Sequence, residues 1–257
     1  MTLEHALVFD VWAPYANFRR VYTTTSATTY AFAPRSSIEG FIAAIMGLDS
    51  EAYPNVLNSS QISIALLSRV NKTSLSVTYT HSDFWDNVAR YLKHGGELKH
   101  NRAPRSMEII REPKYRIFFY SEDMELVSRL ASKMERHQTV YTPYLGSSNM
   151  LANFHLIDAT ASIREIKSED YLPISSIIPF RDKMPSIKIQ KGVTIAVEHN
   201  IPAHITAKRE LQYSYSAVYN PAGSGEIWAK DIKVYNVNYR EESSNIVFIP
   251  AVGPAAK

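Results

Sequence analysis

The residues that could do chemistry gather in two basic stretches that also carry aromatic rings and hydroxyl groups. The first runs from Arg90 to Arg105 and has one acid, Glu97, among five lysines and arginines. The second brackets the hydroxyl-rich segment 22–30 with arginines on both sides. Basic side chains beside hydroxyls and stackable rings are what a groove for single-stranded RNA requires. A solvated loop without a ligand explains the first stretch equally well, so this run alone leaves both interpretations open.

Lys99 and His100 are the pair that could catalyse a reaction. With a tyrosine, such a pair could cleave RNA without a metal, because a base removes the proton of the 2′-OH and an acid protonates the leaving oxygen. The two residues are sequence neighbours just after Gly95-Gly96, and an extended backbone turns neighbours to opposite faces. Phosphate binding tolerates that arrangement. We therefore expect binding without catalysis, with an endoribonuclease as the alternative.

Composition excludes several classes of site. The chain has 257 residues and no cysteine, which excludes disulfides, thiolate metal sites and a cysteine nucleophile and fits the reducing cytoplasm. The histidines lack metal-ligand spacing, and there is no glycine-rich nucleotide loop or nucleophile elbow, so we expect no cofactor and no metal. No apolar run approaches the roughly 18 residues of a membrane span. A net charge of +3 is too small to establish nucleic-acid binding by itself.

Periodic apolar residues indicate the elements that position these groups. Alternation predicts strands near 7–11, 62–66, 75–79, 115–119 and 151–163. Ser36 and Glu39 fit a capping box at the start of a helix that ends at Gly47. A second helix follows Ser121 and carries basic residues in its last turn. The first helix has an apolar stripe formed by Ile38, Phe41, Ile42, Ile45 and Met46.

The order of these elements predicts an α+β fold. Strand, helix, strand, insert, strand, helix and strand in succession give the ferredoxin-like βαββαβ plait of RNA-recognition domains, here over 1–165. The insert, about 81–112, forms an arm. Short strands punctuated by turns predict a β-rich extension over 166–257. Two helices would cover one face of the sheet and leave the other free for a partner, and Trp12 would pack against the extension.

Three stretches resemble one family. They are Phe9-Asp10-Val11-Trp12-Ala13-Pro14-Tyr15-Ala16-Asn17-Phe18-Arg19-Arg20, then Thr29-Tyr30-Ala31-Phe32-Ala33-Pro34-Arg35-Ser36-Ser37-Ile38-Glu39-Gly40, then Tyr141-Thr142-Pro143-Tyr144-Leu145-Gly146-Ser147-Ser148. In this order they are similar to the CRISPR-associated family-five proteins, the RAMP-type subunits of type I Cascade complexes, most of all the type I-B kind. The likeness covers nearly all of residues 5–160.

The resemblance implies a function for the whole chain. Members of the family have a ferredoxin-like domain with a protruding thumb, grip the 5′ handle of the CRISPR RNA (crRNA), and contact the last backbone subunit and the large subunit. Target DNA would be met through the assembled complex. Most members are structural, whereas in one subtype the protein itself cuts repeat RNA with Tyr, Lys and His. A generic interaction module with no RNA role is a third class.

The candidate RNA-binding residues follow from the basic stretches and the resemblance. Arg35 precedes a helix N-terminus that attracts phosphate, with an ion pair to a nearby carboxylate as its alternative. Of Arg19 and Arg20, one is expected to reach RNA. Tyr22 and Tyr30 could stack on bases or cover the core. The full set is Arg19, Arg20, Tyr22, Tyr30, Arg35, Ser36, Lys99, His100, Arg102, Arg105, Tyr144, Gly146, Ser147 and Ser148.

Overall fold

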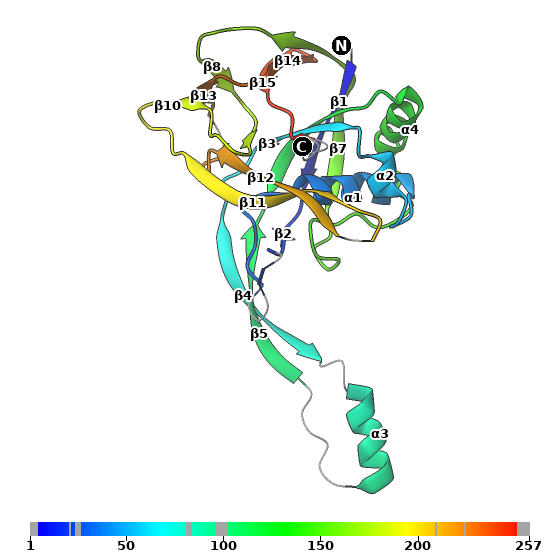
Figure 1. Cartoon of the computed structure of the whole chain (residues 1–257). Coiled ribbons are helices and arrows are strands. Elements are labelled where there is room, and N and C mark those ends of the chain that lie inside the picture. The colour runs from blue at the N-terminus through cyan, green and yellow to red at the C-terminus, as the bar shows by residue number, and fades with distance from the viewer. Residues whose placement is uncertain are drawn as a thin grey trace.

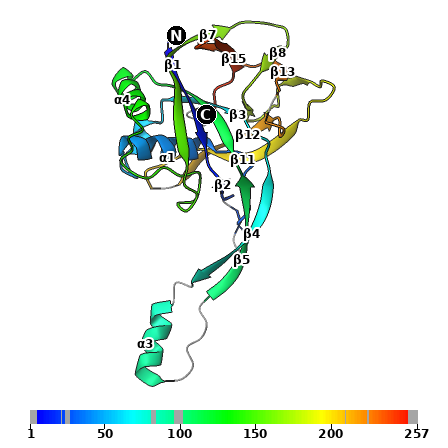
Figure 2. The same cartoon turned by 180° about the vertical axis from the view of Figure 1, so that it is seen from behind.

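A computed structural model of the chain describes residues 5–20, 22–23, 27–80, 84–95, 102–208, 210–223 and 225–250. Within these ranges only the backbone is described at 79–80, 84–87 and 102–103. The protein has a body of sheets and helices and a long arm that projects from it (Figures 1 and 2). None of the described helices is long and apolar enough to cross a membrane.

The body is built on one antiparallel sheet of six strands. Their order is β15-β14-β7-β1-β6-β3. The bounds are β1 His5–Trp12, β3 Gln61–Leu66, β6 Lys114–Tyr120, β7 Asn153–Ile166, β14 Val234–Tyr239 and β15 Glu242–Ile246. The helices are α1 Arg35–Met46, α2 Tyr53–Val56 and α4 Met124–Glu135. The predicted α+β class is confirmed, and each strand and helix expected from periodicity has a counterpart.

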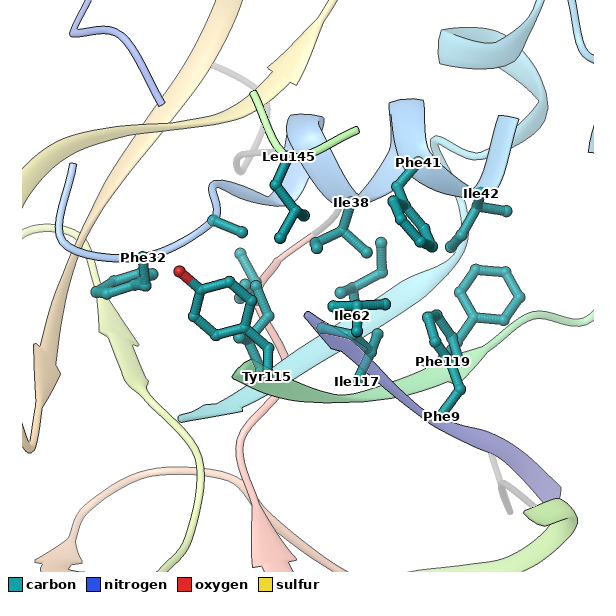
Figure 3. Packing of buried hydrophobic residues seen from close by; sticks show 14 of the residues in the cluster. Phe9, Phe32, Ile38, Phe41, Ile42, Ile62, Tyr115, Ile117, Phe119 and Leu145 are labelled. Carbon is teal, nitrogen blue, oxygen red and sulfur yellow. The ribbon is translucent and has the colours of Figure 1, made fainter. Parts of the chain in front are cut away.

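Helices cover one face of this sheet because alternate strand residues are apolar. Phe9 of β1 and Ile117 of β6 are fully buried against the apolar stripe of α1 (Figure 3). Burying side chains of this size contributes about 1.5–3 kcal/mol each. Asp123 begins α4 by accepting a hydrogen bond from the backbone N–H of Leu126 at 3.0 Å. The apolar stripe of α1 predicted from the sequence therefore forms the main core.

The second face of the sheet is also buried, so the expectation that it is free for a partner is wrong. Val8 and Phe118 on this face are fully buried beside Val237 of β14. The chain leaving β15 reaches the opposite edge of the sheet, where Ile249 N–H donates to Ile62 O at 2.8 Å. The sheet therefore curls, and strands of the C-terminal extension close it. Sequence periodicity predicted that these strands exist but not which edge of the six-stranded sheet they join.

The rest of the extension forms two three-stranded sheets, as its β-rich composition predicted. One has the order β10-β13-β8 and the other β11-β12-β9. The bounds are β8 Leu172–Ile174, β9 Ile178–Phe180, β10 Ser186–Lys188, β11 Ala196–Ile205, β12 Leu211–Tyr219 and β13 Ile227–Lys230.

The arm is a strand pair with a helix at its far end. β4 (Lys72–Thr80) and β5 (Arg102–Arg111) pair without a register shift from Lys72↔Ile110 to Thr80↔Arg102. Helix α3 (Phe84–His94) lies at the tip (Figure 1). At the root, the two-residue strand β2 (Tyr15–Ala16) pairs with β5. The hairpin thus begins at Lys72, earlier than the insert expected from 81, because β4 continues the alternation that led up to that point.

Helix α1 begins on a buried ion pair, which corrects two expectations. Arg35 and Glu39 are 0% exposed, and Arg35 Nη2 lies 2.8 Å from Glu39 Oε1. Arg35 also donates to the backbone oxygens of Ser60 and Leu57 at 3.0 and 3.1 Å. Glu39 therefore does not form a capping box with Ser36, and the helix starts after Pro34 without a side-chain cap. The prediction that Arg35 contacts phosphate is wrong, because its guanidinium is enclosed by the core.

Burial opposes the charges of this pair. It raises the pKa of Glu39 to about 7 even though the Arg35 charge acts to lower it. Burial likewise lowers the pKa of Arg35, and Glu39 offsets only part of that effect. Removing one partner leaves an uncompensated charge in the core, whereas replacing both by apolar residues does not.

We predict that Arg35→Ala lowers the free energy of unfolding by about 3–5 kcal/mol, the usual cost of breaking a buried pair. The double variant Arg35→Met/Glu39→Leu should lose much less. Urea denaturation of the three proteins measures both effects. If Arg35→Ala unfolded at the wild-type urea concentration but lost affinity for RNA, the phosphate interpretation would be restored.

Candidate nucleic-acid interface

The structure brings Ser36 together with Tyr144 and Gly146, although Ser36 lies more than a hundred residues before them in the sequence. They line a pocket of about 220 Å³ between the first turn of α1 and the loop 141–151. A neighbouring depression of about 390 Å³ shares part of this wall and extends it along α1. We call the two together the α1 groove. Its lining residues are Ser36, Ser37, Gly40, Phe41, Ala43, Ala44, Leu48, Asp49, Ser50, Tyr53, Tyr141, Thr142, Tyr144, Gly146 and Ile205.

The chemistry of the α1 groove suits a phosphate beside a ring. The N-terminus of a helix is the positive end of its dipole, which favours an anion, although the N–H groups of Ser37 and Ile38 here donate to Pro34 O. Two serine hydroxyls lie at this end, and the ring of Tyr144 is 42% exposed. No lysine or arginine lines the groove. Charge attraction must therefore come from basic residues outside its walls.

The loop that carries Tyr144 is held by a buried leucine and by a glycine. Leu145 is fully buried beneath α1 (Figure 3), and its backbone oxygen accepts a hydrogen bond from Asn17 N–H at 3.3 Å. Gly146 has a φ of +87°, and a Cβ there would lie 1.9 Å from the backbone oxygen of Asn17. Only glycine fits this close approach. Ser147 Oγ donates to Asn17 Oδ1 at 3.3 Å, while Ser148 is exposed.

Asn17 and Glu108 connect this loop to the arm, and sequence reasoning did not single them out. Asn17 Nδ2 donates to the backbone oxygen of Glu108 on β5 at 2.6 Å. The carboxylate of Glu108 accepts from Thr29 N–H at 2.9 Å and lies 3.6 Å from Lys72 Nζ. Asn17 falls within the first stretch of the family resemblance. The sequence did not show that Asn17 is buried, because a polar residue in a loop gives no periodic signal.

Arg19 and Arg20 point to different surroundings, which decides between them. Arg20 donates to Thr29 O at 3.2 Å and to the Tyr22 hydroxyl at 2.8 Å, and it forms an ion pair with Glu198. Burial acts to lower the pKa of Arg20, but the Tyr22 hydrogen bond and the Glu198 charge outweigh it and raise the pKa. Arg19 is exposed and donates to Thr23 O at 2.8 Å. Arg19 is therefore the arginine that can reach a ligand.

The two predicted stacking tyrosines also differ. Tyr22 is 60% exposed, so its ring remains available. Tyr30 is 1% exposed, donates through its hydroxyl to Asn200 O at 2.7 Å, and has the Arg20 guanidinium 5.3 Å from its ring centre. The prediction that Tyr30 stacks on a base is wrong because the ring belongs to the core.

Two of the remaining predicted residues belong to the arm. Arg105 is exposed on β5, and Arg102 begins the same strand, where only its backbone is described. Lys99 and His100 lie outside the described residues. Among the described residues, no group of three or more His, Cys, Asp or Glu side chains could hold a metal ion.

Trp12 does not pack against the C-terminal extension, which corrects another expectation. It lines an open depression of about 720 Å³ at the root of the arm, together with Lys114 and Leu151. The Lys114 ammonium lies 6.0 Å from the centre of its ring. Trp12 is the last residue of the central strand β1, where it pairs with Lys114 on one side and Asn153 on the other.

Comparison with known proteins gives a consistent result. The model of the family described as CRISPR-associated protein (Cas_Cas5) matches residues 6–177. A solved CRISPR RNA-guided surveillance complex contains a chain with a TM-score of 0.53 and 10% identity, covering 87% of this chain and 91% of that chain. A CRISPR protein from Archaeoglobus fulgidus has a TM-score of 0.48 and 14% identity, covering 94% and 98%. No curated protein matches the chain. The likeness to the surveillance-complex chain is one of fold.

We predict that Gly146→Ala costs more stability than Gly192→Ala. Both glycines have positive φ, +87° and +85°, so both substitutions carry the backbone penalty of about 1–2 kcal/mol. Nothing lies within 4 Å of a Cβ at position 192, whereas at position 146 it would collide with Asn17. Urea denaturation of the two variants isolates the collision. Equal losses would mean that the loop moves away from Asn17 without cost.

Proposed function

The chain belongs to the Cas5 family of CRISPR-associated proteins, and we propose that it is a structural, RNA-binding subunit of a type I Cascade complex that caps the 5′ handle of the crRNA. Membership follows from the family match over most of the chain. The handle role is the part that we add. The observation that carries it is the α1 groove, which unites Ser36, Tyr144 and Gly146 from two of the three stretches that resemble the family.

The fold supports a RAMP domain with a thumb. Within the sheet, the order β7-β1-β6-β3 with antiparallel neighbours is that of a ferredoxin-like plait. We assign the plait to 1–165, the thumb to the arm that begins with β4 at Lys72 and includes the expected insert of about 81–112, and the β-rich extension to 166–257. The type I-B kind remains our assignment from the resemblance alone, and a cytoplasmic location remains our assignment from the lack of cysteine.

Burial of both faces of the sheet favours the α1 groove, and not a face of the sheet, as the RNA site. RNA-recognition domains stack bases on the open face of their sheet. Here that face is filled by its own core, which includes Val8 and Phe118. A single strand entering the groove would set a phosphate at the helix N-terminus and a base on the Tyr144 ring. Arg19 and the basic residues of the arm would supply the long-range attraction.

The arm supports contact with the backbone and large subunits. Leu92 and Tyr91 near the end of α3 are 77% and 38% exposed. Exposed apolar side chains carried away from the body suit a protein partner in an assembly. Target DNA would be contacted through that assembly. The alternative of a repeat-processing endoribonuclease gains no support, because Lys99 and His100 lie outside the described residues.

We predict that Ser36→Asp weakens binding of an RNA carrying the repeat-derived 5′ segment by about tenfold, equivalent to about 1.4 kcal/mol. The carboxylate would repel a phosphate at the helix N-terminus. The same carboxylate interacts favourably with the helix dipole, so the fold is not weakened. Fluorescence anisotropy with labelled RNA measures the affinity.

Ser128→Asp is the matched control. Ser128 is an exposed serine on α4 and is not part of the α1 groove. Both variants change the net charge equally, so any general electrostatic effect is shared. An equal loss of RNA affinity in both variants, or no loss in either, would reject the groove as the handle site.

We predict that Arg19→Ala weakens RNA binding and lowers the dependence of log K on log salt by about 0.7, the value for one phosphate contact on a single strand. The loss should be similar across RNA sequences, because a phosphate contact carries no base information. Anisotropy titrations at several salt concentrations give the slope. An unchanged slope would show that Arg19 serves only its hydrogen bond to Thr23.

A further inference from the structure

The β10-β13-β8 sheet has one face in the core and one face outside. Strand alternation turns Ile227 and Ala229 inward, where both are buried with Ile174. The residues between and beside them turn outward. Lys188 is directly opposite Trp228, and Ser186 is opposite Lys230. The outer face therefore carries a tryptophan and two lysines in adjacent positions.

Each lysine on this face lies over an aromatic ring. Lys188 Nζ is 5.8 Å from the ring centre of Trp228, and Lys230 Nζ is 5.1 Å from that of Tyr171. Trp228 and Lys230 are two residues apart on β13, a spacing of about 7 Å along a strand. Two cation–aromatic pairs thus lie side by side. We call these four residues the outer patch.

The charge of the outer patch has no carboxylate partner within the described chain, unlike that of several arginines in the body. Arg20, Arg35 and Arg116 are each paired with a carboxylate. In the part of the chain that the structure describes, neither Lys188 nor Lys230 has a carboxylate within ion-pair distance. The adjacent acid, Asp231, accepts a hydrogen bond from Ser186 at 2.8 Å. The patch therefore presents two lysines that lie over aromatic rings and are not paired with a carboxylate of the described residues, and Asp231 keeps its own negative charge beside them.

We propose that the outer patch binds single-stranded nucleic acid at a second site, separate from the α1 groove. Single strands bind where positive charge follows the backbone and aromatic rings offer stacking surfaces, and this combination tolerates any sequence. A base stacks on Trp228 or Tyr171, and the lysine that covered the ring turns to the neighbouring phosphate. Ring and charge are already adjacent, so one nucleotide satisfies both.

The position of the outer patch makes it independent of the handle site. β10 and β13 lie beyond residue 177, where the family match ends. In both views the sheet lies away from the arm and on the other side of the body from α1 and α4 (Figures 1 and 2). An unpaired strand such as a displaced DNA strand or an RNA outside the handle has the chemistry that fits.

The test uses the full chain and a labelled oligothymidylate, which has no handle sequence and little structure. The double variant Lys188→Gln/Lys230→Gln should bind it at least about tenfold more weakly, with a salt slope lower by about 1.4, or about 0.7 for each lost contact. Trp228→Leu should also weaken binding severalfold, because it keeps an apolar side chain but removes the stacking surface.

Lys233→Gln is the matched control. Lys233 also lies over a ring, 5.3 Å from the centre of Tyr235, but it is paired with Glu165 at 2.9 Å. This variant should bind oligothymidylate as the wild type does. So should Ser128→Asp on α4, whereas Ser36→Asp is measured with the handle RNA, so failure of this site and failure of the handle site are distinguishable. Wild-type affinity in both the double lysine variant and Trp228→Leu would overturn the proposal, as would an equal loss in Lys233→Gln.

Discussion

The amide of Asn17 lies where the arm meets the 141–151 loop. The residue is 2% exposed, so its polar atoms cannot rely on water and must bond within the protein. Nδ2 bonds to β5 at Glu108, Oδ1 accepts from Ser147, and the backbone N–H bonds to Leu145. One buried side chain therefore fixes the root of the arm against the wall of the α1 groove. The relative placement of two candidate RNA-contacting parts depends on it.

Two of the arginines are likewise held by partners within the protein. A run of basic residues in sequence says how much charge is present but not how much is free. Arg20 is neutralised by Glu198, which is 178 positions away, and Arg35 by Glu39 one helical turn away. The first partnership cannot be read from sequence, because nothing local links the two segments. The second could have been, since Arg35 and Glu39 have the i, i+4 spacing of a helical ion pair.

Individual strands and helices could be predicted from the sequence, whereas the pairing of distant segments that closes the sheet could not. The strand at 7–11 and the stripe of α1 are set by alternation and by the 3.6-residue period, which the chain carries in its own residues. The curl of the sheet depends on Ile249 meeting Ile62, a pairing between distant segments with no shared pattern. Strand β5 was not predicted from the sequence, for a different reason. The part of β5 that leaves the body with the arm is exposed and carries few apolar residues, so it shows no apolar alternation.

The buried pair that begins α1 explains how the groove keeps its shape. Burying two charges costs more than a single ion pair returns unless further hydrogen bonds satisfy the groups, and here the carbonyls of Leu57 and Ser60 accept hydrogen bonds from the two terminal nitrogens of Arg35. Those carbonyls belong to the turn that follows α2, which lies directly before β3. The first turn of α1 is thereby tied to the turn that enters the sheet. Ser36 and Ser37 follow Arg35 immediately, so the interaction that holds Arg35 in the core also holds their hydroxyls at the mouth of the groove.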